Sequence, residues 1–358
     1  MLPRKKHNYL YLAFLFKFGK CSMFVGIDVG GANTKIATAD GFVDSLYAPL
    51  WKDKECLYDV LTEVNQKFGT EIEAVGAVMT GELSDCFETK REGVLHIKHA
   101  LSATFEAPKF LDVNCTFKES SEVDRAPLSF AATNWLASSK LIAEQYQDVV
   151  FVDIGSTTTD VIPIVGSEIK AQRTDLERLK SGELIYSGIL RTNIAALLKN
   201  VYIGEQGEEC DVSSELFAIT ADAYLVLGNI TKDDYGCGSP NSYAFVGREN
   251  DEKSRVSAMR RISRVVCSDL EEIGEDGAVN IAEQVKSAQV DELSASLRSL
   301  KEKYGLEMVV AAGIGDFVVK EAADSVNIRF LSLSSSYGKN IAATFPAFAV
   351  AKLLEKNL

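Results

Sequence analysis

The chain of 358 residues lacks closely spaced cysteines and has few histidines. Its seven cysteines are so scattered that the two nearest stand 27 residues apart, which excludes C-x-x-C zinc and redox motifs. An odd number of scattered cysteines is typical of reduced thiols, and we therefore expect a cytoplasmic protein. The three histidines, His7, His96 and His99, could not complete a zinc site without ligands from elsewhere in the chain.

Positive charge is also scarce, because 38 Lys and Arg stand against 51 Asp and Glu, for a net charge of -13. General nucleic-acid binders present a basic surface. The balance therefore argues against a nucleic-acid partner, while it leaves room for a local pocket that binds a small anion. The apolar run Tyr9–Phe16 is too short to cross a bilayer, which takes about 20 residues, so we expect no membrane partner.

The first 22 residues differ from the rest, since they carry five Lys or Arg and no acid. A basic start followed by a short apolar run is similar to a signal peptide. However, no small-residue cleavage site precedes Phe24, and a strand with a Gly-rich turn begins directly after Met23. We favour translation that really begins at Met23, and we expect residues 1–22 to be dispensable for folding.

Apolar spacing along the chain predicts an α/β protein. We expect strand–turn–strand units over residues 24–38 and 149–164, and single strands over 72–79, 306–312 and 329–333. We expect helices over residues 56–68, 127–146, 188–198, 213–227, 255–272 and 341–354. The segment 229–252 has the least regular pattern and is expected to form a polar loop.

The two strand–turn–strand segments repeat one pattern at a constant offset of 125 residues. IDVGGANTKIA begins at Ile27 and VDIGSTTTDVI begins at Val152, so that Asp28 aligns with Asp153 and Gly30 with Gly155. Glycine at a hairpin tip lets main-chain N–H groups approach an anion without a Cβ in the way. The repeat therefore predicts a duplicated architecture with one phosphate-binding hairpin in each half.

The residue types around each tip suit phosphate chemistry. The predicted phosphate-binding residues are Gly30, Gly31, Ala32, Asn33, Thr34 and Lys35 in the first segment and Gly155, Ser156, Thr157 and Thr158 in the second. Carboxylates repel a phosphate directly, so we expect Asp28, Asp153 and Asp160 to act through a Mg²⁺ ion or its waters. A third Gly-rich turn, AAGIGDF, contains Gly313 and Gly315 and follows an apolar strand.

With two matched hairpins and a third Gly turn, the chain resembles the superfamily of acetate kinase, sugar kinases, heat-shock chaperones and actin. That resemblance implies a duplicated actin-like, ribonuclease H-like ATPase fold with two domains around a phosphate-binding cleft. We expect the first domain over residues 23–147 together with a returning helix in 340–358, and the second over 148–339. In the superfamily, the turn at Gly313 and Gly315 lies near the nucleotide base.

Longer segments narrow the resemblance to one family. MTGELSDCFETKREGV, FAATNWLASS, RLKSGELIYSGILRTNIAAL and ELFAITADAYLVLG, with the three Gly turns, resemble the hydantoinase/oxoprolinase-related group of methanogens and methylotrophs, over residues 24–354. That group is linked to tetrahydromethanopterin-dependent one-carbon metabolism, and its characterised activity belongs to methanofuran biosynthesis. The resemblance implies a transferase that joins an (aminomethyl)furan-methyl diphosphate to the phenol of γ-glutamyltyramine and releases diphosphate.

For that reaction we expect further roles outside the hairpins. Glu82 or Asp85, after the strand over 72–79, would accept the phenol proton, with a helix-start carboxylate as the alternative for Glu82. Arg91 and Arg191 would bind the glutamyl carboxylate, or would be exposed or structural arginines. Trp135 and Tyr186 would line an aromatic site, with core packing as the alternative for both.

Two other functions use the same loops and stay open from the sequence. One is an ATP-dependent small-molecule kinase or a hydantoinase/oxoprolinase-like amide hydrolase, and the other is a nucleotide switch or filament protein of the actin type. The chain also departs from the family after ADAYLVLG, where DDYGCGSPNS replaces a T-A-D-G-R-like run.

Overall fold

The computed structural model describes residues 23–204, 206–236 and 252–358. The predicted N-terminal extension, residues 1–22, lies outside the described residues, as does most of the predicted loop 229–252. The contacts divide the chain into two units. Unit 1 contains the residues up to Ala137 together with Pro346–Leu358, and unit 2 contains Ser138–Phe345.

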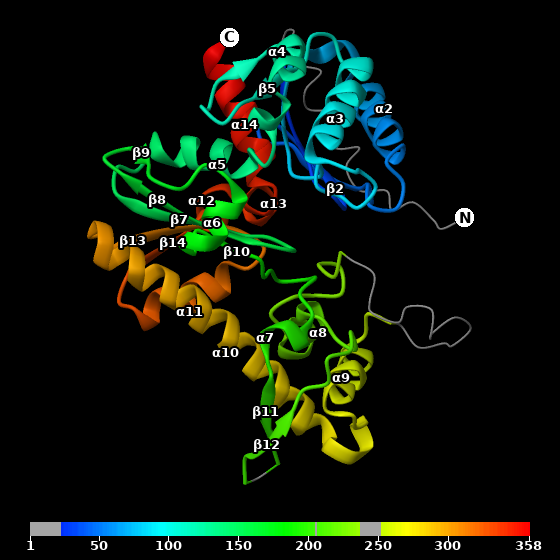
Figure 1. The fold of residues 1–358 in the computed structure, drawn as a ribbon, viewed down its shortest axis with the longest axis vertical. Helices are drawn as coiled ribbons and strands as arrows, with labels where there is room; N and C mark the ends of the chain where they lie inside the picture. The colour runs from blue at the N-terminus through cyan, green and yellow to red at the C-terminus, as the bar shows by residue number, and fades with distance from the viewer. Residues whose placement is uncertain (1–22, 205, 237–251) are drawn as a thin grey trace. The chain divides into compact units, whose positions relative to one another are not determined.

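Unit 1 is built on a six-stranded sheet of order β3-β2-β1-β4-β5-β6 (Figure 1). Its strands are β1 (Met23–Val29), β2 (Asn33–Thr38), β3 (Val43–Tyr47), β4 (Ile72–Met79), β5 (Lys109–Leu111) and β6 (Phe117–Lys118). β1, β2 and β3 are antiparallel neighbours, whereas β1, β4 and β5 run parallel. The strands over 24–38 and 72–79 are therefore confirmed.

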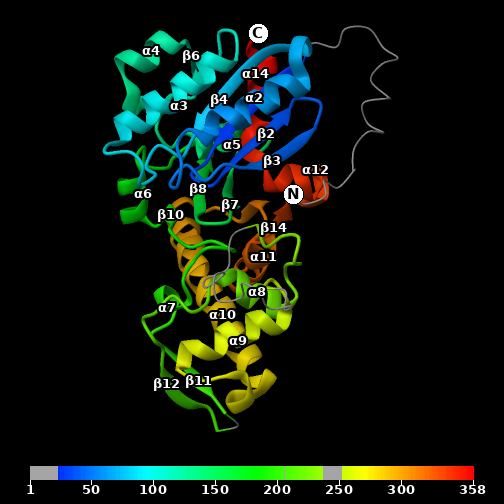
Figure 2. The ribbon, with the colours of Figure 1, turned by 90° about the vertical axis from the view of Figure 1, so that its right-hand side faces the viewer.

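Helices cover both faces of this sheet. The core of one face joins Val25, Ile27 and Val29 of β1 to α2 (Cys56–Phe68) and α3 (Lys90–Thr104). On the other face lies α14 (Phe345–Asn357), which returns from the C-terminal end of the chain (Figure 2). A Cβ on Gly26 would come within 2.0 Å of the carbonyl oxygen of Ala347, so this glycine is what allows the helix to approach β1 so closely. Two short elements, α4 (Ser120–Arg125) and a 3-10 turn (Pro127–Phe130), complete the unit.

Unit 2 repeats the plan with a sheet of order β10-β8-β7-β13-β14, to which β9 adds beside β8. Its strands are β7 (Val149–Ile154), β8 (Thr159–Val165), β9 (Glu168–Ile169), β10 (Leu184–Ile185), β13 (Met308–Gly313) and β14 (Arg329–Ser332). In both units an antiparallel hairpin is followed in space by two parallel strands, β1-β4-β5 and β7-β13-β14. The fold is thus a duplicated α/β fold of the actin-like, ribonuclease H-like type, as predicted.

Unit 2 also contains a second group of elements joined to its sheet by α10 (Leu270–Tyr304). This group consists of α7 (Ile194–Leu197), α8 (Thr220–Leu227), α9 (Arg255–Ser263) and the hairpin of β11 (Asn200–Ile203) and β12 (Glu208–Asp211). α10 contacts α8, α9 and β11 at one part and α11 (Asp316–Ser325) and β8 at another. The remaining elements are α5 (Asn134–Ala143), at the division of the units, α6 (Asp175–Ser181), α12 (Leu333–Tyr337) and α13 (Lys339–Ala343).

Several predicted helices were too long. The pattern over 127–146 forms a 3-10 turn and α5, and that over 341–354 divides at Thr344 into α13 and α14. In the pattern over 255–272, α9 ends at Ser263 and a 3-10 turn (Arg264–Val266) follows, which ends at Cys267 in a left-handed conformation with φ of 55°. Within 188–198 and 213–227 only α7 and α8 are helical. In the first range, the N–H groups of residues 189–191 donate to another loop instead. No helix in the described ranges combines the length and apolar character that crossing a membrane requires.

Candidate functional site

The first hairpin places a buried carboxylate opposite a lysine. Asp28 at the end of β1 is the register partner of Lys35 on β2, and their charged atoms, Oδ2 and Nζ, are 3.9 Å apart. The Asp28 side chain is nearly inaccessible, whereas that of Lys35 remains 30% exposed. The tip is closed by a hydrogen bond from Gly30 N–H to the Asn33 carbonyl of 3.1 Å. The Lys35 ammonium group is therefore accessible to a ligand, whereas the Asp28 carboxylate is buried.

The loop after β4 lies directly against this tip. The N–H groups of Thr80 and Gly81 donate to the Val29 carbonyl at 2.8 and 2.9 Å. A Cβ on Gly81 would come within 3.0 Å of the Gly30 main chain, and a Cβ on Gly31 would come within 3.1 Å of the Ser84 hydroxyl oxygen. Ser84 is thus a polar group at the tip that the sequence analysis did not identify.

Glu82 is held in the same loop with only 1% of its surface exposed. Its main chain packs so tightly on α3 that a Cβ on Gly93 would lie 2.1 Å from the Glu82 carbonyl oxygen. Glu82 precedes α3 by several residues, so the alternative of a helix-start carboxylate does not describe it. Asp85 and Arg91, by contrast, are exposed, and within the described part of the chain neither side chain bonds to the hairpin.

The second hairpin has a different charge pattern on the same backbone. Asp153 on β7 is the register partner of Asp160 on β8, and Gly155 N–H closes the tip on the Thr158 carbonyl at 2.9 Å. Asp160 forms an ion pair with Arg178, which is 1% exposed and also lies 3.3 Å from Asp175. Ser156, Thr157 and Thr158 are half-buried at the tip. The predicted metal ligand Asp160 therefore already has a cationic partner.

The segment Ser187–Arg191 forms a second wall of this tip. Ile189 N–H donates to the Gly155 carbonyl, and the N–H groups of Leu190 and Arg191 donate to the Ser156 carbonyl, each at 3.0 Å. A Cβ on Gly188 would come within 2.5 Å of the Thr157 nitrogen, so only glycine fits there without displacing the loop. The structure thereby places Arg191 beside the hairpin. Its guanidinium has no hydrogen bond or ion pair with any described residue.

A buried polar network supports that segment from behind. Gln289 of α10 accepts a hydrogen bond from the Tyr224 hydroxyl at 2.5 Å and donates to the Gly188 carbonyl at 3.1 Å. Thr220 also donates to the Gly188 carbonyl, at 2.9 Å. The sequence analysis missed the loop that this network supports, because the pattern ILRTNIAALL has helical spacing. A Ser-Gly pair before that pattern is nevertheless a common signal for a break.

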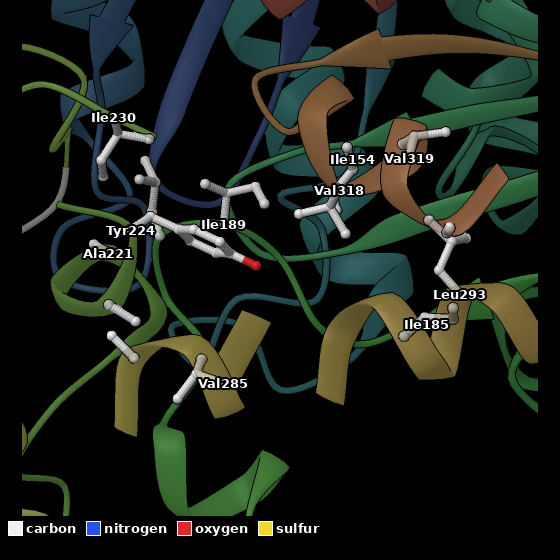
Figure 3. Packing of buried hydrophobic residues seen from close by; sticks show 14 of the residues in the cluster. Ile154, Ile185, Ile189, Ala221, Tyr224, Ile230, Val285, Leu293, Val318 and Val319 are labelled. Atoms are coloured by element: carbon white, nitrogen blue, oxygen red, sulfur yellow. The ribbon is translucent and has the colours of Figure 1, made fainter. Parts of the chain in front are cut away.

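The third Gly-rich turn completes the site of unit 2. Gly313 has φ of 87°, and a Cβ there would lie 2.1 Å from the Ile154 carbonyl oxygen and 2.7 Å from Oδ1 of Asp153. Ile314 N–H donates to that same carbonyl at 3.1 Å. Ile154, Ile189 and Val318 belong to one apolar cluster, so the three segments share a packed base (Figure 3). The turn at Gly313 and Gly315 is thus beside Asp153, within one unit.

The two aromatic residues predicted to line the site, Trp135 and Tyr186, differ sharply in exposure. Trp135 is 2% exposed in α5, so that core packing describes it, whereas Tyr186 is 66% exposed and directly precedes the segment that walls the second tip. Cys86, which follows Asp85, is an unsuitable nucleophile, because burial raises the pKa of its thiol and leaves little thiolate near neutral pH.

The carboxylates of the two hairpins suit a metal ion that binds together with a phosphate ligand, rather than one held by protein side chains alone. In the described ranges no group of three or more His, Cys, Asp or Glu side chains is placed to hold a metal ion. Mg²⁺ commonly binds through one or two carboxylates, its own waters and substrate phosphates. Asp28 in unit 1 and Asp153 in unit 2 each provide one such carboxylate beside a Gly-rich turn.

Comparison with known proteins gives one family and two curated relatives, one of which matches nearly the whole chain. The hydantoinase/oxoprolinase family model matches residues 73–357. A Methanocaldococcus jannaschii protein named (4-{4-[2-(gamma-L-glutamylamino)ethyl]phenoxymethyl}furan-2-yl)methanamine synthase is 38% identical over 341 residues, which cover 94% of this chain and 98% of the relative. A Methanococcus vannielii protein of the same name is 37% identical over 216 residues, 59% of this chain and 93% of the relative.

Among solved structures, a ROK family glucokinase from Streptomyces griseus, in complex with glucose and AMPPNP, is similar to this chain. It is 12% identical, with 90% of this chain and 99% of the glucokinase covered and a TM-score of 0.43.

Proposed function

This chain belongs to the hydantoinase/oxoprolinase family, and we propose that it catalyses the ether-forming reaction of methanofuran biosynthesis. The main support for this proposal is the 38% identity to the M. jannaschii synthase over nearly the whole of both chains. The product in that synthase's name is an aryl ether, in which a phenoxymethyl group links the glutamylaminoethyl arm to a furan bearing a methanamine. The chain is accordingly an enzyme of the transferase type, with small-molecule substrates.

The substrates that yield this product are an (aminomethyl)furan-methyl diphosphate and γ-glutamyltyramine. The phenol oxygen forms a bond to the furan-methyl carbon, and the bond from that carbon to the diphosphate oxygen breaks. The electron pair leaves with diphosphate, and the phenol proton passes to a base on the enzyme. Because an electron-rich furan stabilises positive charge on its methyl carbon, the enzyme's main task is to neutralise the departing diphosphate.

Each hairpin by itself has the parts of a diphosphate cradle. The first offers main-chain N–H groups at Gly31 and Ala32 with the partly exposed Lys35, and the second offers the hydroxyls of Ser156, Thr157 and Thr158. Fixed donors of this kind act on charge as it develops, and each is typically worth about 10²–10³ in rate. Holding both substrates in reacting geometry contributes further through effective molarity.

A Mg²⁺ ion bound with the diphosphate would be held by the carboxylate of the hairpin that binds it, Asp28 in the first or Asp153 in the second, and would neutralise charge on the leaving group. We assign no such role to Asp160, whose carboxylate pairs with Arg178.

Glu82 is the group to which we assign the phenol proton. A phenol with a pKa of about 10 needs a base or a late proton transfer. Glu82 is buried in the loop against the first tip, whereas Asp85 in that loop is exposed. The glutamyl carboxylate of the second substrate is assigned to Arg191, because Arg91 lies exposed on α3 and has no bond to the described hairpin. The described cysteines are free thiols, which suits our placement of the enzyme in the cytoplasm.

The test is a reaction of the full chain with furan-methyl diphosphate, γ-glutamyltyramine and Mg²⁺ in the absence of ATP, followed by mass spectrometry. We expect the ether and one equivalent of diphosphate. Glu82→Gln should lower kcat strongly, and the matched Asp85→Asn variant should retain it. An ether that forms only with ATP, or ATP turnover without furan substrate, would instead indicate a kinase or amide hydrolase.

A further inference from the structure

Three large apolar side chains are exposed around the tip of the first hairpin. Tyr47 is 60% exposed, Trp51 is 51% exposed and Leu83 is 63% exposed. In the described part of unit 1, only Leu128 and Leu358 are comparable. Exposed apolar side chains gathered at one place on a soluble protein commonly mark a ligand-binding surface.

The strand register places Tyr47 beside the charged groups of the hairpin. Tyr47 ends β3 and is the direct partner of Asn33 on β2, while Lys35 on β2 is the partner of Asp28 on β1. Direct partners share a face of the sheet, and residues two apart on one strand share it as well. The Tyr47 ring therefore lies on the face that carries the Lys35 ammonium group.

Trp51 and Leu83 lie on segments that are fixed to the same tip. Leu50, directly before Trp51, donates its N–H to the Gly31 carbonyl at 2.9 Å, and Ala48 donates to the Ala32 carbonyl at 3.0 Å. Leu83 directly precedes Ser84, whose hydroxyl lies beside Gly31. The backbones are thus anchored while the apolar side chains remain accessible.

Tyr47 and Trp51 each keep more than half of their surface exposed. Among the described residues, the rings of Tyr47 and Trp51 take part in no aromatic pair and no cation–π contact, although other rings of unit 1 do, such as Phe42 with Phe68. Anchored, accessible ring faces next to an ammonium group and a Gly turn fit a molecule that has an apolar ring at one end and an anionic group at the other.

We propose that Tyr47 and Trp51, with Leu83 at their edge, bind the furan ring of the furan-methyl diphosphate beside the first hairpin. The assignment rests on the proposed function, which supplies a substrate with a ring one carbon away from its diphosphate. Positive charge develops on the furan-methyl group as its bond to oxygen breaks, and aromatic faces attract such charge. The rings therefore hold the substrate and favour its ionisation.

Affinity measurements separate the ring's contribution from that of the diphosphate. Calorimetry should give furan-methyl diphosphate a Kd about ten-fold lower than that of inorganic pyrophosphate for the wild type, both with Mg²⁺. In the double variant Tyr47→Ala, Trp51→Ala the two ligands should bind alike, with the pyrophosphate Kd changed by less than about two-fold. An unchanged ratio in the double variant would overturn the proposal, and this readout needs no ether formation.

Kinetics and fluorescence give a second readout. Trp51→Ala should raise KM for furan-methyl diphosphate and leave KM for γ-glutamyltyramine unchanged, and Trp51→Phe should restore the first value. Trp51 is one of two tryptophans, and the other, Trp135, is buried, so the furan substrate should quench emission in the wild type and not in Trp51→Phe. Tyr202→Ala, an equally exposed tyrosine of β11, is the matched control and should behave as wild type. Wild-type KM in Trp51→Ala would contradict the assignment.

Discussion

The hairpins of the two units share a backbone and differ in charge. In unit 1, Asp28 faces a lysine that is partly exposed and loosely held at 3.9 Å. In unit 2, the equivalent Asp153 faces a second carboxylate, Asp160, and the cation that neutralises it is the buried Arg178. The first hairpin therefore keeps a positive charge available to a ligand, whereas the second uses its positive charge for structure and presents hydroxyls.

The two repeated segments therefore share the backbone geometry of a hairpin, but their side chains have different roles. Positions 35 and 160 are equivalent, yet one holds a ligand-accessible cation and the other half of an internal ion pair. Loss of the cation beside each hairpin should therefore have different effects: loss of Arg178 should lower stability, and loss of Lys35 should weaken ligand binding.

The largest effect should follow Arg178→Met. Removing the guanidinium leaves Asp160 and Asp175 without their buried cation, which typically costs about 3–5 kcal/mol of folding free energy. Thermal unfolding should show a clear drop in Tm. Lys35→Met is the comparison and should change stability by no more than about 1 kcal/mol, because its ion pair is partly exposed. Equal Tm values for the two variants would contradict the division.

Asp153→Asn should have the next largest effect, on rate. The leaving group gains charge in the transition state, so we expect a fall of about 10²–10³ in kcat, a smaller change in KM and a nearly unchanged melting curve. If Asp153 only caps the turn through main-chain N–H groups, Asn would serve almost as well. A folded variant with near-normal kcat would remove Asp153 from the mechanism.

Ligand choice sharpens the comparison next. If diphosphate is a leaving group, pyrophosphate with Mg²⁺ should stabilise the chain at least as well as ADP does. Stabilisation at about 100 times Kd amounts to about 2.7 kcal/mol, and it should fall when EDTA removes the metal. Stabilisation by ADP with none by pyrophosphate would favour the kinase interpretation.

The smallest effect should separate two glycines of the second site. Gly188→Ala places a Cβ within 2.5 Å of the Thr157 main chain, so the loop must shift, at a cost of about 1–3 kcal/mol. Gly155→Ala meets nothing closer than 3.7 Å and should leave Tm unchanged, while it weakens pyrophosphate binding at the tip. A lower Tm for Gly155→Ala than for Gly188→Ala would contradict the close packing of the segment Ser187–Arg191 against the second tip.

Local patterns predicted the parts of the fold that depend on nearby residues. The Asp-x-Gly repeat indicated both hairpins, and α2 begins and ends where the apolar spacing placed it. The 35-residue helix α10 was missed because Gly274, with φ of 70°, and mixed spacing interrupt its pattern. The segment from Gly188 was assigned to a helix because the hydrogen bonds of residues 189–191 go to Gly155 and Ser156, more than 30 positions away.

The site was predictable where a motif is continuous and not where it depends on distant partners. The tips followed from their glycines and hydroxyls, whereas nothing local to Asp160 reveals that Arg178 neutralises it. Similarly, Tyr47 becomes a neighbour of Lys35 only through the register of β2 and β3. Trp135 is of a residue type that often binds ligands, but it packs in the core.

The central claim is that the bond between the furan-methyl carbon and the diphosphate oxygen breaks. Furan-methyl diphosphate labelled with ¹⁸O at that bridging oxygen tests it directly, with mass spectrometry of both products after reaction with γ-glutamyltyramine and Mg²⁺. We expect the label in the released diphosphate and an unlabelled ether. Unlabelled diphosphate, with the label retained on the furan-methyl product, would mean that the phosphorus–oxygen bond breaks and would contradict the proposed reaction.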